Sequence, residues 1–200
     1  MTTLLLIRHA ETDAVGKLIA GSLPGWHLNG TGKAQAARLA ERLRRIPIAA
    51  IYTSPLERAV ETAEPIASQH QLELNRLSDL EEMRMGAWEG MTIADLDQLI
   101  DRRRFNAYRS GVRVPGGELM IETQMRAVRQ LDLLRERHPN QCVAIVSHAD
   151  VLRASLAHFL GTPLDLMLRM EISPASVSVV ELGDWAPRVL CINDTGDVPS

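Results

Sequence analysis

The chain has few aromatic side chains, no excess of basic charge and no long hydrophobic run. Aromatic residues make up 4% of its 200 positions, and 22 lysines and arginines are set against 25 aspartates and glutamates. Proteins that bind nucleic acid usually carry a basic surface and aromatic side chains that stack on bases, so we expect no nucleic-acid partner. No apolar run approaches the roughly 18 residues that a membrane span requires, so we expect no membrane partner.

Cysteine is scarce as well. Cys142 and Cys191 are the only two, and each lies within an apolar run. Such surroundings suit a buried, unpaired thiol, and disulfide-dependent secreted domains are smaller and richer in cysteine. The first apolar run is too short for a signal peptide and follows no basic segment. We therefore expect free thiols and a cytoplasmic location.

The rest of the composition is that of an ordinary soluble protein. Hydrophobic residues make up 46% of the chain and charged residues 24%, which is close to the average for globular domains. The chain shows no internal repeat, low-complexity tract or break in composition. Because this length suffices for one hydrophobic core, residues 1–200 are predicted to form a single domain.

Short apolar runs alternate with segments of helical periodicity. Strands are predicted at Leu4–Ile7, Ala49–Tyr52, Val143–Val146, Ala175–Glu181 and Arg188–Ile192, the last two paired around a turn at 183–187. Helices are predicted at 30–46, from Ser54 onward, from Thr92 toward Tyr108, at 118–137 and at 149–160, with Gly161 as the last C-cap. This alternation predicts an α/β fold, a three-layer sandwich with a mainly parallel central sheet flanked by helices.

The helix after the second strand has a distinct N-terminal pattern. Ser54 suits the N-cap, Pro55 the first helical position and Glu57 a capping box. A proline inside a helix removes a backbone hydrogen bond, so we expect this helix to bend or end near Pro65.

Side chains that bind anions follow three of the predicted strands. Arg8 and His9 come directly after the first strand, and His148 directly after Val143–Val146. Arg58 lies in the first turn of a helix, where its positive charge opposes the helix dipole unless an anion lies nearby. One such residue alone is commonly structural. Because the carboxyl ends of parallel strands meet at one edge of the sheet, all four are expected to share a cleft.

Phosphate is the anion that this set fits best. Its oxygens match the two-pronged guanidinium group of arginine and the free amides of a helix N-terminus. Hydrolysis of phosphate monoesters has one of the highest uncatalysed barriers known, so binding alone is not enough. A nucleophile that divides the reaction into two steps is required, and a neutral imidazole can serve.

Six segments carry a resemblance to a known family. They are "LLLIRHAET", "GWHLNGTGKAQA", "YTSPLERAVETA", "EEMRMGAWEG", "VPGGEL" and "VAIVSHADVLR", in this order. Together they resemble the histidine phosphatase superfamily in its phosphoglycerate mutase-like branch. The resemblance covers about residues 4–160.

The resemblance implies a role for each anion-binding residue. His9 would be the nucleophile that becomes transiently phosphorylated, and Arg8, Arg58 and His148 would hold the phosphoryl oxygens. Glu82 would protonate the leaving alcohol and then activate the attacking water. Because attack needs neutral His9 and donation needs protonated Glu82, we expect a bell-shaped pH profile on the acidic side of neutral.

Further residues are assigned by the same resemblance. Those expected at the substrate phosphate are Thr12, Gly21 and Ser22. Glu81 and Glu89, which neighbour the expected acid, are interpreted as structural.

The chain departs from the family pattern in ways that favour a phosphatase over a mutase. Val15 stands where the mutases resemble one another in carrying Asn, and the insertion typical of mutases between Glu82 and His148 is missing. Ala10 replaces a frequent glycine and still leaves the backbone room to approach a phosphate.

Metal chemistry is the competing interpretation of the same residues. His9, His148 and Glu82 could be ligands, but no zinc-binding spacing or cysteine cluster is present. Two arginines in the cleft would also repel a divalent cation. We therefore expect no metal and no other cofactor.

Together these features predict a metal-independent phosphatase that hydrolyses small phosphate monoesters through a phosphohistidine intermediate on His9. A sugar phosphate, a phosphoglycerate and an alpha-ribazole phosphate are all substrates that the resemblance allows. Two alternatives stay open: a cofactor-dependent phosphoglycerate mutase, and a low-turnover protein that binds a phosphate ligand. The resemblance also leaves a homodimer open.

Residues 83–117 lie between the chemical motifs and are the best candidates for a specificity wall. They include Arg102–Arg104, Arg109 and Arg113. They fit either a solvated helix face balanced by nearby aspartates or a contact to a second anionic group of the substrate. Trp26 and Trp88 fit either the pocket or apolar packing.

Overall fold

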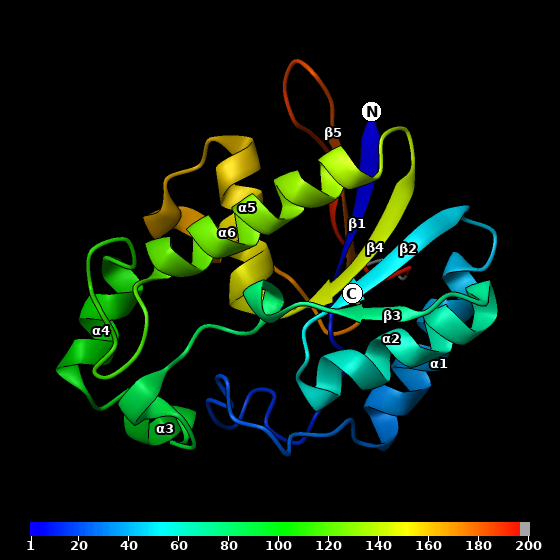
Figure 1. Cartoon of the computed structure of the whole chain (residues 1–200). Coiled ribbons are helices and arrows are strands. Elements are labelled where there is room, and N and C mark those ends of the chain that lie inside the picture. The colour runs from blue at the N-terminus through cyan, green and yellow to red at the C-terminus, as the bar shows by residue number, and fades with distance from the viewer. Residues whose placement is uncertain (197–200) are drawn as a thin grey trace.

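The computed structural model describes residues 1–196. Within this range a six-stranded sheet has the strand order β3-β2-β4-β1-β5-β6 (Figure 1). The strands are β1 (Thr2–Arg8), β2 (Ile48–Thr53), β3 (Leu74–Arg76), β4 (Cys142–Ser147), β5 (Val177–Leu182) and β6 (Arg188–Asp194). The pairings among β1 to β4 are parallel, whereas β5 pairs antiparallel with both β1 and β6.

Helices cover both faces of the sheet. The long ones are α1 (Gly30–Leu43), α2 (Glu57–His70), α5 (Met120–Arg137) and α6 (Ala149–Leu160). Successive side chains of a strand point to opposite faces, so Leu5 and Ile7 of β1 pack with α1 and α2, whereas Leu4 and Leu6 pack with α5 and α6. Figure 1 shows the two helix pairs on either side of the sheet. The predicted three-layer α/β fold with a mainly parallel sheet is confirmed.

A third apolar cluster anchors the segment between β3 and α5. This segment contains α3 (Ile93–Leu96) and α4 (Ile100–Ala107). Phe105 of α4 is completely buried, and its ring meets the ring of buried Trp88 edge to face at 5.4 Å between centroids. Both side chains belong to one cluster with Ala154 and Ala157 of α6. Trp88 is therefore a packing residue, and α4 is fixed beside α6.

The predicted start of the second helix is wrong by two residues. α2 begins at Glu57, with Leu56 rather than Ser54 at the N-cap position. The Ser54 hydroxyl instead accepts the backbone N–H of Leu56 and lies 2.8 Å from Nε2 of His148. Of the bend or end expected near Pro65, the structure excludes the end, because the helix continues through Pro65 to His70.

Two further elements differ from prediction. The helix expected from Thr92 toward Tyr108 is divided into α3 and α4, although Thr92 does accept the backbone N–H of Asp95 as an N-cap. Strand β3 was not predicted, because its three residues carry no apolar alternation. The expected final helix is confirmed from Ala149 to Leu160, with Gly161 in the left-handed conformation.

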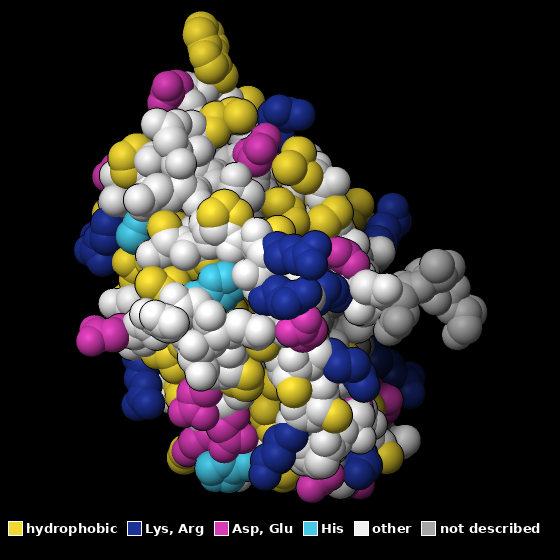
Figure 2. Space-filling model, turned by 90° about the vertical axis from the view of Figure 1, so that its right-hand side faces the viewer, with side chains coloured by type: hydrophobic (Ala, Val, Ile, Leu, Met, Phe, Trp, Pro, Cys, Tyr) yellow, Lys and Arg dark blue, Asp and Glu magenta, His cyan; other side chains and the backbone are white. Residues whose placement is uncertain are grey.

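Three further features concern membrane-spanning helices, the two cysteines and the distribution of surface charge. Among the described residues, no helix combines the length and apolar character needed to cross a bilayer. Cys142 and Cys191 are unpaired but only half-buried, and burial raises the pKa of the Cys142 thiol to about 11. On the face shown in Figure 2, basic side chains lie in small groups beside acidic ones.

Candidate active site

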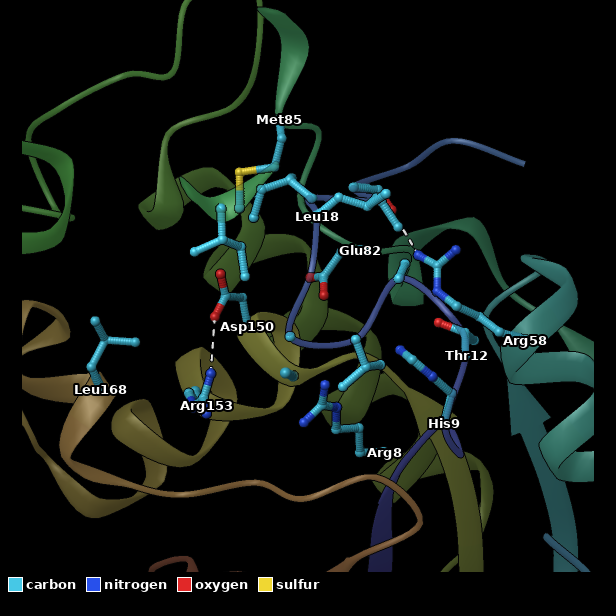
Figure 3. Close-up of a pocket in the computed structure, with 18 of the residues that line it drawn as sticks. Arg8, His9, Thr12, Leu18, Arg58, Glu82, Met85, Asp150, Arg153 and Leu168 are labelled. Carbon is cyan, nitrogen blue, oxygen red and sulfur yellow. Dashed lines mark hydrogen bonds and ion pairs between the residues drawn. The ribbon is translucent and has the colours of Figure 1, made fainter. Parts of the chain in front are cut away.

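The carboxyl ends of β1, β2 and β4 border a cavity of about 330 Å³. Of the residues predicted to bind or to react, those that line it are Arg8, His9, Thr12, Gly21, Arg58 and Glu82. His148 lies next to this group, with its ring centroid 5.2 Å from that of His9. Ser22 is not part of the lining. Figure 3 shows Glu82 between Asp150 on one side and His9 with Arg58 on the other.

His9 is held as a neutral imidazole. Its side chain is buried, and Nδ1 lies 2.7 Å from the carbonyl oxygen of Ala10. A carbonyl oxygen only accepts hydrogen bonds, so Nδ1 carries the proton and Nε2 keeps its lone pair. Burial first, and then the charges of Arg58 and Arg8, lower the pKa of His9 well below its ordinary value. Nε2, which has no hydrogen-bond partner among the described residues, is therefore available as a nucleophile at neutral pH.

The two arginines are fixed by backbone carbonyls rather than by carboxylates. Arg58 is 2% exposed, and its Nη2 donates to the Gly21 carbonyl at 2.7 Å. Nη1 of Arg8 donates to the Ile172 carbonyl at 2.6 Å, while its Nε is buried without a partner among the described residues. Carbonyls orient a guanidinium group without neutralising it. Both positive charges thus stay available to an anion in the cavity.

Gly21 is required by its conformation and by its neighbour. Its φ of +52° lies in the left-handed region, and an added Cβ would come within 2.4 Å of a Glu89 side-chain oxygen. That same Glu89 oxygen accepts the backbone N–H and the hydroxyl of Ser22, each at 2.8 Å. It also accepts the N–H of Met85 at 3.1 Å. Glu89 therefore links the loop of Ser22 to the loop of Met85, which agrees with its interpretation as a structural residue. The backbone N–H and hydroxyl of Ser22 are both used in this link.

Ser54 sets the hydrogen bonding of His148. The Ser54 oxygen lies 2.8 Å from Nε2, and its own proton is free because the Leu56 N–H occupies a lone pair. When Ser54 donates to Nε2, the neutral ring carries its proton on Nδ1, which is buried without a partner among the described residues. His148 then presents one unused N–H. The sequence predicted that Ser54 caps a helix. Its role in orienting His148 becomes visible only in the folded structure, where the two side chains meet.

Glu82 occupies an environment that favours its protonated form. Burial and the charge of Asp150 raise the pKa of Glu82 to about 7, against the lowering effects of the Met83 amide and of Arg58 and Arg8. The Met83 N–H donates to Oε1 at 2.9 Å. The group is therefore poised to give or take a proton near neutral pH. Neighbouring Glu81 lies outside this cavity.

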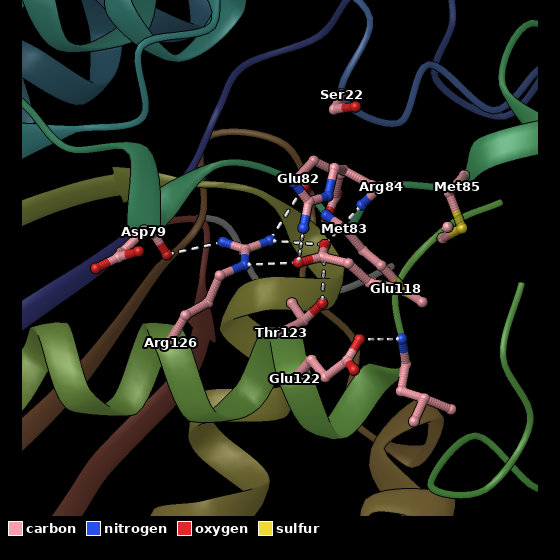
Figure 4. A network of polar contacts seen from close by, with 12 residues as sticks. Ser22, Asp79, Glu82, Met83, Arg84, Met85, Glu118, Glu122, Thr123 and Arg126 are labelled. Carbon is pink, nitrogen blue, oxygen red and sulfur yellow. Dashed lines mark hydrogen bonds and ion pairs between the residues drawn. The ribbon is translucent and has the colours of Figure 1, made fainter.

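A buried ion pair supports the loop that carries Glu82. Glu118, from the "VPGGEL" segment, is 4% exposed and pairs with Arg126 of α5 at 3.2 Å. It also accepts the backbone N–H of Arg84 at 2.8 Å. The Arg126 guanidinium donates to the carbonyl oxygens of Asp79 and Glu82, as Figure 4 shows. These contacts hold the backbone on both sides of the candidate acid.

Two supporting residues escaped the sequence analysis. The Thr62 hydroxyl accepts the N–H of Ala10 at 2.9 Å and donates to the carbonyl of Arg58, so it ties the His9 loop to α2. Asp150 lines the cavity and lies partly buried between Arg109 and Arg153. An acidic residue in the first turn of a helix is common for dipole reasons, so the position of Asp150 alone carried no functional signal.

No group of three or more His, Cys, Asp or Glu side chains within residues 1–196 is arranged to hold a metal ion. The arginines of segment 102–113 do not all share one environment: some belong to a solvated surface, and others line the cavity where a second anionic group of the substrate would lie. Arg104 and Arg113 are solvated and pair with Asp101 and Glu122, whereas Arg102 and Arg109 line the cavity.

Comparison with known proteins identifies the family. The family model for the histidine phosphatase superfamily (branch 1) matches residues 4–195. Phosphoserine phosphatase 1 of Hydrogenobacter thermophilus is 33% identical over 199 residues, which cover 98% of this chain and 93% of that protein. The adenosylcobalamin/alpha-ribazole phosphatase of Escherichia coli is 31% identical over 194 residues, 95% of either chain.

A solved structure agrees with these relatives. YhfR of Bacillus stearothermophilus superimposes with a TM-score of 0.91 at 32% identity, over 97% of this chain and 98% of that one. Because the family model spans most of the chain and the two named enzymes are phosphatases matched over most of their length, the protein is a phosphatase and belongs to branch 1 of the histidine phosphatase superfamily.

Proposed function

We propose that this phosphatase hydrolyses small phosphate monoesters without a metal ion, through a phosphohistidine intermediate on His9. The observation that carries the proposal is the neutral His9 ring, whose Nδ1 is held by the Ala10 carbonyl and whose Nε2 is free. Two uncompensated arginines lie beside it, where they can bind the phosphoryl oxygens. A structure that only bound phosphate would not need a nucleophile in this tautomer.

The reaction follows from the positions of these groups. Nε2 of His9 attacks phosphorus, the bond from phosphorus to the ester oxygen breaks, and the proton of Glu82 passes to the departing oxygen. Water then attacks the phosphorus atom of the phosphohistidine, so that a bond from its oxygen to phosphorus forms, the bond from Nε2 to phosphorus breaks, and the Glu82 carboxylate takes the proton of the water. Arg8, Arg58 and the unused N–H of His148 stabilise the charge on the phosphoryl oxygens in both steps.

The size of the cavity favours a small substrate. Its volume of about 330 Å³ is near the lower end of ligand cavities, which span roughly 300–1,000 Å³. The relatives named above act on phosphoserine and on alpha-ribazole phosphate, according to their names. Both compounds belong to the class of small phosphate monoesters.

We also propose that residues 1–200 form a single domain and that the protein is cytoplasmic. Assembly into a homodimer remains a prediction.

The proposed function is tested by hydrolysis of p-nitrophenyl phosphate in excess EDTA, followed by a panel of small monoesters. We expect full activity in the chelator, because positive charge from arginine takes the place of a metal ion. Loss of activity in EDTA that returns with a divalent metal would overturn the metal-free mechanism. Turnover that requires a bisphosphate primer would instead support the mutase alternative.

The pH profile tests the assignment of Glu82. With the pKa of Glu82 near 7 and that of His9 well below 6.5, kcat/KM for an alkyl phosphate should be high at mildly acidic pH. It should fall above about pH 7, where Glu82 loses the proton that it donates. Asp150→Asn removes the negative charge that raises this pKa, so its alkaline limb should move to lower pH. An unchanged limb in the variant would contradict the coupling of the two carboxyl groups.

A further inference from the structure

The cavity continues beyond the proposed phosphate site to a wall built by α4, the turn that follows it and α6. The wall residues that line it are Arg102, Asn106, Arg109, Asp150 and Arg153. Three of the five carry positive charge and one carries negative charge. Which of these charges are already paired decides what the wall can bind.

Arg109 is paired within the protein. Its side chain is 4% exposed, and Nη1 contacts Oδ2 of Asp150 at 2.9 Å. Its Nη2 donates to Oδ1 of Asn106 at 3.2 Å. Asp150 also contacts Arg153 at 3.4 Å, and Arg153 has a further carboxylate neighbour in Glu171 at 3.6 Å. The charges of Arg109 and Arg153 are therefore compensated by carboxylates.

Arg102 is not paired. Among residues 1–196 no carboxylate lies within ion-pair distance of it, and its Nε and Nη1 are buried without a hydrogen-bond partner. Its guanidinium carbon lies over the Trp88 ring, 6.0 Å from the ring centroid. Burial, and next the charge of Arg109, lower the pKa of Arg102. A half-buried guanidinium group without a partner lowers the stability of the folded protein, because its charge has lost water and gained no counter-charge. A bound anion would supply that counter-charge.

Asn106 offers a second donor on the same face of α4. It lies four residues after Arg102, one helical turn further on. Arg109 can only donate, so the Asn106 amide must turn its oxygen toward Arg109. This orientation leaves the NH₂ group of Asn106 with no partner among the described residues. The wall thus presents one free guanidinium and one free amide donor.

We propose that Arg102 and Asn106 bind a carboxylate group of the substrate, so that the enzyme prefers phosphate monoesters that also carry a carboxylate. The inference rests on the proposed function, which places the phosphate at His9 in the same cavity. A planar monoanion matches one free guanidinium and one amide. A second phosphate would bring more negative charge beside Asp150 than the single free cation offsets. Phosphoserine and phosphoglycerates belong to the preferred class.

Matched substrates and matched variants test the proposal. O-Phosphoserine and O-phosphoethanolamine differ only in the carboxylate, so wild type should show a kcat/KM at least tenfold higher for phosphoserine. Arg102→Gln should lower kcat/KM for phosphoserine at least tenfold, mainly through KM, and change that for phosphoethanolamine less than twofold. The control Arg103→Gln, at an exposed neighbour on α4, should change neither. Equal losses on both substrates, or no loss on phosphoserine, would overturn the carboxylate subsite.

A binding measurement separates this proposal from the proposed function. The methylene phosphonate analogue of phosphoserine and its decarboxylated counterpart cannot be hydrolysed, and calorimetry gives the ratio of their dissociation constants. A ratio of ten or more that disappears in Arg102→Gln supports the subsite whatever the enzyme hydrolyses. A ratio near one overturns the subsite, even if p-nitrophenyl phosphate is turned over as proposed.

Discussion

His9→Ala should abolish turnover of every phosphate monoester. We expect kcat to fall by at least about 10⁴-fold, because removal of the nucleophile of another two-step hydrolase costs about 10⁶-fold. The remaining arginines would still bind the phosphate, so KM or the dissociation constant of an inert analogue should change far less than kcat. The measurement is steady-state hydrolysis of p-nitrophenyl phosphate, followed by binding of the phosphonate analogue.

A matched control separates the nucleophile from a general loss of folding. His158 lies on α6 and is exposed. His158→Ala should retain full activity, and both variants should unfold at similar urea concentrations. A His9→Ala protein that is folded and still turns over at more than a hundredth of the wild-type rate would rule out His9 as an obligatory nucleophile.

Glu82→Gln should produce a loss that depends on the leaving group. Glutamine preserves the shape of the protonated acid and cannot give up a proton. For alkyl phosphates, whose leaving oxygen needs that proton, kcat/KM should fall by about 10²–10⁴-fold. For p-nitrophenyl phosphate, whose leaving group departs unprotonated, the rapid first release of nitrophenol should change less than tenfold. Stopped-flow absorbance measures that first release.

The adjacent carboxyl group gives the control for this prediction. Glu81 precedes Glu82 directly but lies outside the cavity, so Glu81→Gln should behave like wild type on both substrate types. Equal losses of Glu82→Gln on alkyl and aryl esters would argue for a role in positioning alone. Full activity on alkyl esters would exclude Glu82 as the proton donor.

The fold was predictable because its layers leave a local pattern. Leu4–Ile7 is apolar throughout, as a strand between two helix layers must be, and the structure packs its alternate residues into opposite cores. The starts of helices were less predictable. Ser54 has every local property of an N-cap, yet its hydroxyl contacts His148, ninety-four residues away. A contact of that range leaves no trace in local sequence.

In the candidate site, too, some features follow from local sequence and others depend on long-range packing. Arg8, His9, Arg58 and His148 were placed together from the strand ends that they follow, because parallel strands end at one edge. The wall formed by Arg102, Asn106 and Asp150 could not be derived in this way. It depends on how α4 packs against α6 through buried Phe105, and no pattern in segment 102–113 distinguishes Arg102 from its exposed neighbours. The single-domain interpretation stays a prediction.

Covalent transfer to His9 can be observed directly by rapid quenching of the wild-type enzyme with a radiolabelled phosphate monoester. The proposed mechanism predicts label on the protein that approaches one per chain before the steady state. The label should be lost in acid and stable in base, as expected for a phosphorylated imidazole, and should map to His9. Product release without any protein-bound label, or label that persists in His9→Ala, would contradict the mechanism.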